Sequence, residues 1–303
     1  MLDRVDAPTT LGAWASPEIN DPTADRMLSA RSDLIADTRS DLPIANFFYP
    51  WSADPLAGDL EAQVLAAGGI PMVSWNDRDN ARVVSGAEDG RVRRIARGFA
   101  ALDGPVLLRW GWEMDAESSD GGSGSTGGAE LYVQTWTHLR DIFREEGADN
   151  VEWVWCPNAY AFTPQADRDP TAFYPGDDQV DWLCADGYNW YPSRGSWRSF
   201  SEIFSDFYAW AEQRDTPILI GEFGVLEDPS RPDRKADWIL AMARTVVCEM
   251  PEIRGLVYFN ELRTDDEGIT RDWRLTTSST SLRAWQTVAD ERHFGGDGNA
   301  AKC

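Results

Sequence analysis

The chain has 303 residues and 42% hydrophobic content, which is enough to bury one large core, and we expect a single domain. Its 51 acidic residues outnumber the 28 basic ones and give a formal net charge of −23. A surface of this charge repels nucleic acid and anionic membranes, so both are excluded as partners and a neutral substrate is favoured.

Eight short apolar segments recur along the chain, with helical stretches between them. They span 10–14, 43–49, 70–75, 105–110, 151–156, 181–188, 217–223 and 255–260. Strands that alternate with helices are typical of a mostly parallel sheet. Eight strands in about 300 residues match a (β/α)8 barrel, whose active-site residues lie at the C-terminal strand ends. We therefore predict an α/β fold, a TIM barrel over residues 1–293 with a flexible tail at 294–303.

The stretches between the strands include three amphipathic helices. They are expected at 129–148, 201–214 and 234–250, where apolar residues recur at helical spacing. Four tryptophans fall on predicted helix faces, and we assign them to packing: Trp136, Trp210, Trp238 and Trp285. The Gly/Ser-rich segment 115–128 directly follows the fourth strand, which predicts a flexible loop beside the site.

Two glutamates stand where predicted strands end. Glu113 ends the fourth strand in VLLRWGWEMD, and Glu222 ends the seventh in TPILIGEFGV. Glycoside cleavage uses two carboxyl groups, about 5 to 5.5 Å apart when configuration is retained. Trp110 and Trp112 give Glu113 an apolar setting suited to a proton donor. The alternative is a structural salt bridge across the barrel mouth, and the nearest rival carboxyls are Glu261 and Asp115.

Six segments, taken in order, resemble glycoside hydrolase family 26, a family of (β/α)8 retaining glycosidases. They are GGIPMVSWND, VLLRWGWEMD, GADNVEWVWCPN, VDWLCADGYNWYP, TPILIGEFG and YFNELRTDDEGITRDWRL. The resemblance implies that Glu113 is the general acid/base and Glu222 the nucleophile, with Arg109 and Tyr188 holding the nucleophile. It also implies that no cofactor is needed.

The chain departs from this family at two positions near the expected cleavage point. Mannan-cleaving members usually carry a histidine immediately before the acid/base glutamate, where Trp112 stands here, and another where Asn76 stands. The departure leaves the glutamate roles intact and opens the question of sugar specificity.

Further candidates for substrate binding lie at or just beyond the strand ends. Aromatic faces there can stack on sugar rings, and amides can bind hydroxyl groups, with core packing and ordinary loop capping as the alternatives. The aromatic candidates are Trp14, Trp51, Trp75, Trp155, Trp190 and Tyr191, and the amide candidates are Asn158, Asn189 and Asn260.

The cysteines and histidines do not form a metal-binding pattern. His138 and His293 are far apart in the chain, neither neighbours a cysteine, and no CxxC motif occurs, so we expect no metal. Cys156 and Cys184 fall at or within adjacent predicted strands. A disulfide between them is conceivable, but we favour buried free thiols.

Taken together, these features predict a retaining endo-β-glycosidase that cleaves a polysaccharide backbone, with β-mannan first and β-glucan or xylan as alternatives. The rival functions are a non-catalytic carbohydrate-binding barrel and a transglycosylase of exopolysaccharide metabolism. We expect a monomer whose partner is a polysaccharide or oligosaccharide substrate.

The location and host of the protein are also open to prediction. The start, MLDRVDAPTT, lacks the basic residues and apolar stretch of a signal peptide. We expect a secreted protein whose export signal is absent from this sequence, and a cytoplasmic protein is the alternative. Lysine occurs only at Lys235 and Lys302. A GC-rich genome would explain this, but we favour a salt-loving host because codon bias does not account for so much Asp.

Overall fold

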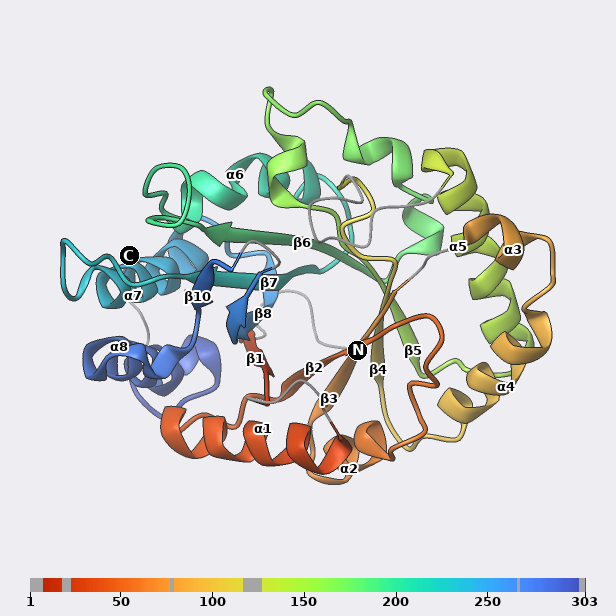
Figure 1. The fold of residues 1–303 in the computed structure, drawn as a ribbon, viewed down its shortest axis with the longest axis horizontal. Coiled ribbons are helices and arrows are strands. Elements are labelled where there is room, and N and C mark those ends of the chain that lie inside the picture. The colour runs from red at the N-terminus through yellow and green to blue at the C-terminus, as the bar shows by residue number, and fades with distance from the viewer. Residues whose placement is uncertain (1–7, 18–22, 77–78, 117–126, 266–267, 300–302) are drawn as a thin grey trace. The chain divides into compact units, whose positions relative to one another are not determined.

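The computed structural model describes residues 8–17, 23–76, 79–116, 127–265, 268–299 and 303. Eight parallel strands follow one another in chain order around a closed barrel (Figure 1). They are β1 (Thr10–Ala15), β2 (Ile44–Tyr49), β3 (Ile70–Trp75), β4 (Val106–Trp110), β5 (Val151–Trp155), β6 (Trp182–Asn189), β7 (Ile218–Val225) and β8 (Ile253–Asn260). The predicted (β/α)8 barrel is confirmed.

Helices separate the strands along the chain. They are α1 (Ala24–Thr38), α2 (Leu60–Ala66), α3 (Asn80–Val84), α4 (Asp89–Ala100), α5 (Gly128–Glu145), α6 (Phe200–Ala211), α7 (Arg234–Cys248) and α8 (Ser279–Asp290). The three helices expected from amphipathic spacing are α5, α6 and α7. The start of α6 shows why: Ser199 accepts a hydrogen bond from the backbone of Glu202, whose side chain bonds back to Ser199, a capping box that satisfies two free N–H groups.

Shorter elements lie in the loops. An antiparallel hairpin, β9 (Leu262–Thr264) and β10 (Thr270–Asp272), follows β8. Five 3₁₀ turns are described: η1 (Ala159–Phe162), η2 (Pro170–Phe173), η3 (Asp177–Gln179), η4 (Leu275–Thr277) and η5 (Arg292–Phe294). Within the described residues, no helix has both the length and the apolar character needed to cross a membrane.

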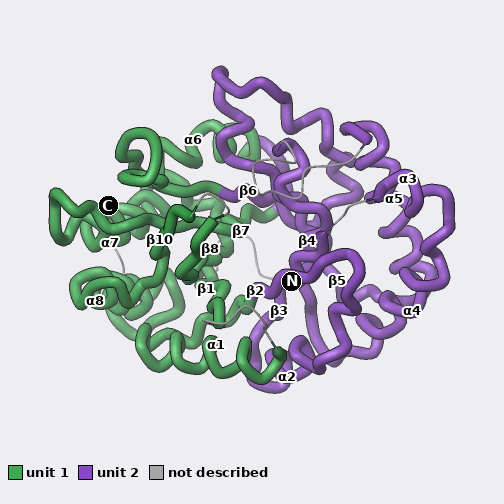
Figure 2. The backbone as a smooth tube through the Cα atoms, viewed as in Figure 1, with its two compact units in different colours: residues 1–45, 187–212, 217–303 green, residues 46–186, 213–216 purple. Residues whose placement is uncertain are grey.

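The chain divides into two compact units, which Figure 2 colours separately. Unit 1 comprises residues 1–45, 187–212 and 217–303, and unit 2 comprises residues 46–186 and 213–216. In unit 1, β7 pairs with β8, and α7 packs against α8 and α6. In unit 2, β4 pairs with β3 and β5, and α5 packs against α3 and α4. The two units are described separately below.

Strand alternation in unit 2 decides which side chains pack under the helices. Successive side chains of a strand point to opposite faces. Trp110, the neighbour of Arg109, is fully buried and stacks on Tyr132 with ring centroids 5.0 Å apart, and its edge meets Trp136 of α5. Trp110 therefore belongs to the helix-facing layer, which corrects our expectation that it provides the apolar setting of Glu113.

Disulfides replace the free thiols that we favoured. Cys156 is bonded to Cys184, and Cys248 of α7 is bonded to Cys303. The first pair follows from register, because Trp155 lies beside Leu183 in the β5–β6 pairing and the next residues are therefore neighbours. The second pair ties the last residue to α7 within unit 1, in a segment where we predicted a flexible tail, while the boundary at residue 293 stays a prediction.

Candidate active site

Glu113 lies in a tight turn that follows β4. The turn begins when Gly111 donates its N–H to the Trp75 carbonyl at 2.9 Å. Glu113 itself has φ of 50°, a left-handed conformation that costs a non-glycine residue of order 1 to 3 kcal/mol. Its N–H donates to the Cys156 carbonyl at 2.7 Å, which holds the strained turn in place. The half-buried carboxyl is thus carried by a fixed backbone.

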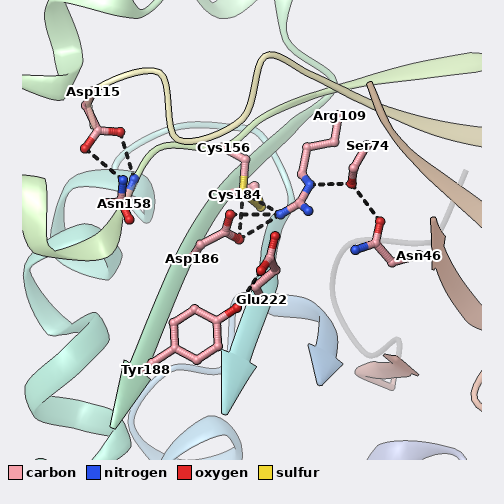
Figure 3. A network of polar contacts seen from close by, with 10 residues as sticks. All are labelled: Asn46, Ser74, Arg109, Asp115, Cys156, Asn158, Cys184, Asp186, Tyr188 and Glu222. Atoms are coloured by element: carbon pink, nitrogen blue, oxygen red, sulfur yellow. Dashed lines mark hydrogen bonds and ion pairs between the residues drawn. A yellow bond between two sulfur atoms is a disulfide. The ribbon is translucent and has the colours of Figure 1, made fainter. Parts of the chain in front are cut away.

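Unit 2 also contains a buried polar network on four strands (Figure 3). Arg109 of β4 bonds both carboxylate oxygens of Asp186 through one guanidinium nitrogen, at 3.0 and 2.8 Å. Its Nε donates to Ser74 Oγ at 2.8 Å, and Ser74 donates to Asn46 Oδ1 at 2.7 Å. All four side chains are at most 1% exposed. Arg109 is therefore fixed in place by its own ion pair.

The carboxyl of Asp115 is committed to the loop that follows β5. It accepts the backbone N–H of Asn158 at 2.9 Å and the side-chain amide of the same residue at 3.3 Å (Figure 3). Burial raises the pKa of Asp115, and the bonds from Asn158 oppose the rise. Asp115 is thereby a loop anchor, and the amide of Asn158, which we expected to bind sugar, serves the loop in this structure.

In unit 1, Glu222 lies within β7 and is 6% exposed. Tyr188 of β6 donates its hydroxyl to Glu222 Oε2 at 2.5 Å (Figure 3), which is the hydrogen bond that the sequence led us to expect. The Tyr188 ring packs against Trp190, with centroids 5.2 Å apart, and against Trp273, at 4.9 Å, and these two indoles also contact each other. The buried carboxylate thus accepts a hydrogen bond from a phenol whose ring packs against two tryptophans.

A second carboxyl of unit 1, Glu261, is affected by the charge of Glu222. Glu261 follows β8 and accepts the indole N–H of Trp14 at 3.0 Å. Burial is the main cause of a raised pKa at Glu261, and the negative charge of Glu222 adds to it. Trp14 is 8% exposed. The two glutamates are therefore close enough to interact electrostatically, and Trp14 is engaged with one of them.

Two of the aromatic candidates lie in the core, which corrects our prediction that they contact sugar. Trp75 and Trp155 are fully buried. Trp155 donates its indole N–H to the Phe173 carbonyl at 3.1 Å, and Trp75 stacks on the half-buried Trp51 with centroids 4.4 Å apart. Trp155 precedes Cys156, and alternation along β5 turns the indole away from that neighbour.

Among the other aromatic and amide candidates, Trp14 and Asn189 are buried and the rest are half-buried, and contact with sugar stays a prediction for all of them. Trp112 packs against Phe48, with ring centroids 5.3 Å apart. Trp190 carries the Arg194 guanidinium 3.8 Å from its ring centroid. The half-buried candidates are Trp51, Asn76, Trp112, Tyr188, Trp190, Tyr191 and Asn260.

Asn189 and Asn260, like Asn158, form hydrogen bonds within loops, which is the alternative to sugar binding. Asn189 is buried and donates to the Arg198 carbonyl at 2.8 Å, and Asn260 Oδ1 accepts the Leu275 N–H at 2.8 Å.

Sequence reasoning missed Asn46, Ser74 and Asp186, which surround Arg109, and Trp273, which packs on Tyr188. A signal for the first three exists, because each interrupts an otherwise apolar strand, and a buried polar side chain needs a partner. Nothing in the sequence distinguishes Trp273 from the other tryptophans.

One cluster of side chains in unit 2 has the composition of a metal site. Cys156, Cys184 and Asp186 offer ligand atoms within 4.8 Å of one another. The two sulfurs, however, are bonded to each other, and the carboxylate is paired with Arg109. The donor atoms are engaged, so this cluster does not fit a metal ion.

Comparison with known families decides the identity of this fold. The sequence profile described as glycosyl hydrolase family 26 matches residues 85–250, which is more than half of the chain. The chain belongs to glycosyl hydrolase family 26. The matched range contains Glu113, Arg109, Tyr188 and Glu222.

Relatives in the family carry different names. Endoglucanase H of Acetivibrio thermocellus is 29% identical over 81% of this chain and 27% of its own length. A β-1,3-xylanase of a Vibrio species is 30% identical over 46% of this chain and 28% of its own length. The chain thus spans little more than a quarter of these curated relatives.

Solved structures of the family share the fold at low identity. A β-mannanase of Bacteroides ovatus superposes with a TM-score of 0.63 at 17% identity, covering 98% of this chain and 91% of that one. The catalytic domain of an endo-β-1,4-mannanase of a Bacillus species gives 0.67 at 15% identity, covering 95% and 86%.

Proposed function

We propose that this family 26 protein is a retaining endo-β-glycosidase in which Glu222 is the nucleophile and Glu113 the general acid/base. The observation that carries the proposal is the buried Glu222 with the Tyr188 hydroxyl on one of its oxygens. A hydrogen bond to the ionised form favours that form, which a nucleophile requires. The strained backbone of Glu113 supports its role, because strain of this kind concentrates at functional residues.

The reaction proceeds in two displacements. A carboxylate oxygen of Glu222 attacks the anomeric carbon while Glu113 gives its proton to the leaving glycosidic oxygen, and the C–O bond to the leaving sugar breaks. A glycosyl ester on Glu222 results. Glu113, now ionised, takes a proton from water, whose oxygen attacks the anomeric carbon and releases Glu222. The net configuration is retained, as is general in this family.

Arg109 is proposed to hold the nucleophile and to stabilise its charge. The support in unit 2 is that Arg109 is fully buried and that Asp186 and Ser74 fix the direction of its guanidinium. A cation held by a carboxylate and a hydroxyl does not reorganise during the reaction, which is the condition for electrostatic catalysis.

The substrate is proposed to be a β-linked polysaccharide backbone, with β-glucan or xylan favoured over β-mannan. Two observations support this choice: Trp112 stands where mannan-cleaving members carry a histidine, and the curated relatives are named an endoglucanase and β-1,3-xylanases. An indole offers one donor and no acceptor, whereas an imidazole offers both. The mannanase likeness rests on fold.

The test is a panel of soluble β-mannan, mixed-linkage β-glucan, β-1,4-xylan and β-1,3-xylan. Product sizes are read by chromatography, and the anomer formed first is read by proton NMR. We expect a ladder of medium-sized products and a β-anomer. A folded protein that cleaves none of the four would support the non-catalytic barrel, and products longer than the substrate would support a transglycosylase.

A further inference from the structure

Lys235 is a buried cation in unit 1, the unit that also contains Glu222. It lies in α7 and has no exposed surface. Its ammonium donates to the Arg274 carbonyl at 2.7 Å, to Thr277 Oγ1 at 3.1 Å and to the Trp273 carbonyl at 3.3 Å. The chain has one other lysine, Lys302, so the lysine at this buried position does not reflect the general composition of the chain. The three N–H groups of an ammonium diverge from one nitrogen and can reach these three acceptors, whereas the donors of a guanidinium are fixed in one plane.

A carboxylate balances this charge through an intervening hydroxyl. Thr277 accepts from Lys235 and donates its own proton to Glu227 Oε1 at 2.7 Å. The same oxygen accepts from Ser278 and Ser281 of the α8 start, each at 2.9 Å. Burial lowers the pKa of Lys235 to about 8, and Glu227 opposes the drop.

The segment held by Lys235 carries Trp273, which is anchored at every polar atom of its backbone. Its N–H donates to the Glu261 carbonyl at 2.8 Å. Its carbonyl accepts the Tyr258 hydroxyl at 2.7 Å in addition to Lys235. The indole is 2% exposed. Such anchoring fixes where the ring stands.

The ring of Trp273 packs against the ring of Tyr188. The centroids are 4.9 Å apart, and Gly224 makes this approach possible. A Cβ on Gly224 would lie 3.0 Å from Trp273 Cε3 and 3.3 Å from Tyr188 Cδ1, tighter than ordinary packing. Gly224 stands two residues beyond Glu222 on β7. Backbone, indole and phenol thus form one packed unit whose hydroxyl lies on Glu222.

We propose that Lys235 is a positioning residue for the nucleophile, acting by fixing residues 273–277 and, through the Trp273 ring, the Tyr188 hydroxyl on Glu222. The inference rests on the proposed role of Glu222. Lys235 itself contacts neither substrate nor reacting atoms. Loss of its three hydrogen bonds leaves the Trp273 backbone held by Glu261 and Tyr258 alone, and Tyr188 then holds Glu222 less firmly.

The test compares Lys235→Met with wild type on a polysaccharide that the wild type cleaves. We expect kcat to fall about tenfold to a hundredfold with KM little changed, as for a misplaced catalytic group. The acid limb of the pH profile should move to higher pH, because a weakened hydrogen bond stabilises the ionised nucleophile less. In a Tyr188→Phe background, Lys235→Met should cost less than twofold more, since both changes remove the same contact.

Ser281→Ala is the matched control. Ser281 is buried and bonds the same oxygen of Glu227, but among the described hydrogen bonds its side chain makes none to Lys235 or Trp273. It should lower the melting temperature and leave kcat and the pH profile unchanged. If Lys235→Met does not fold, Thr277→Val is measured in its place, because it removes one acceptor of Lys235 and keeps the lysine. An unshifted acid limb, or fully additive losses with Tyr188→Phe, would overturn the proposal.

A crystal structure of Lys235→Met separates this inference from the proposed function. Displacement of Tyr188 from Glu222 would support the positioning role even if wild type cleaved no substrate, a result that overturns the function alone. An unchanged Tyr188 hydroxyl and an unchanged 273–277 segment would overturn the positioning role whatever the activity.

Discussion

Glu113 and Glu222 differ in how the backbone holds them. Glu222 lies within β7, where the register with β8 shifts between Ile220 and Phe223, and its position is supported by a side-chain hydrogen bond from Tyr188. Glu113 sits at φ of 50° in a turn, and its position is supported by a backbone hydrogen bond to Cys156. A nucleophile must stay ionised and point at the anomeric carbon, whereas a general acid must reach the oxygen of the leaving group.

Azide distinguishes the two glutamates. With an activated aryl β-glycoside, Glu113→Ala can still form the glycosyl ester, and azide then attacks it to give the β-azide. Glu222→Ala forms no ester, so azide attacks in the place of the carboxylate and gives the α-azide. Proton NMR coupling separates the anomers of gluco-configured sugars. Both variants should lose about 10³-fold or more in kcat on polysaccharide.

Wild type with azide is the control and should yield no glycosyl azide. An α-azide from Glu113→Ala, or a first product of inverted configuration from wild type, would contradict the role assignment.

Trp112→His tests sugar choice. Trp112 packs on Phe48 and lies 5.3 Å from the Arg109 guanidinium carbon. Replacement by histidine restores a donor and an acceptor, so the ratio of kcat/KM on β-mannan to that on β-glucan should rise about tenfold. Trp197→His, a half-buried tryptophan outside the candidate set, controls for the loss of an indole. A ratio that does not move would show that the residue before Glu113 does not select the sugar.

At the scale of elements, the contact between β2 and α2 contains an unusual carboxyl. Glu61 of α2 has no exposed surface and accepts the Tyr49 hydroxyl on Oε1 at 2.6 Å. Its Oε2 has no hydrogen-bond partner among the described residues. Burial raises the pKa of Glu61 to about 7. The helix is therefore packed on a carboxyl that the fold prefers neutral.

This contact predicts a pH dependence of stability. A carboxyl with a raised pKa in the fold stabilises the native state fully below its ordinary pKa of 4.5, and the contribution is lost as pH rises through about 7. Between pH 4.5 and pH 8, ionisation of Glu61 should lower the free energy of unfolding of the wild type by up to about 3 kcal/mol. Glu61→Gln should remove the loss, so urea midpoints of the two proteins should diverge toward pH 8.

Glu249→Gln, an exposed change, is the control and should follow wild type at every pH. Parallel curves for wild type and Glu61→Gln between pH 5 and pH 8 would show that Glu61 is ionised in the fold.

At the scale of the whole molecule, the net charge of −23 sets a repulsion that salt screens. If the host is salt-loving, the melting temperature should rise by at least ~5 °C between 0.1 and 2 M NaCl as carboxylates are screened. Asp33, Asp37 and Asp206 are exposed on α1 and α6, and the first two repel at i, i+4. Replacing all three by Asn should reduce the salt response. A melting temperature that does not change with salt would favour genome composition as the reason for the scarcity of lysine.

The sequence by itself determined the barrel and the positions of its two strand-end glutamates. Apolar runs separated by amphipathic helices record a local periodicity, and eight of them leave few topologies other than a closed parallel barrel. Glu222 lies in β7 and Glu113 just beyond β4 for the same local reason.

Only the tertiary structure decided which face each strand residue occupies and what it meets there. Successive residues of β3 and β5 face opposite sides of the sheet, but which side a residue takes depends on barrel closure and on the helices that cover the strands, and so Trp75 and Trp155 proved to be core. The ion pair of Arg109 with Asp186 and the bonds of Lys235 to residues 273–277 join segments far apart in the chain. Such partners depend on barrel closure and helix packing, because no local pattern encodes contacts between distant segments.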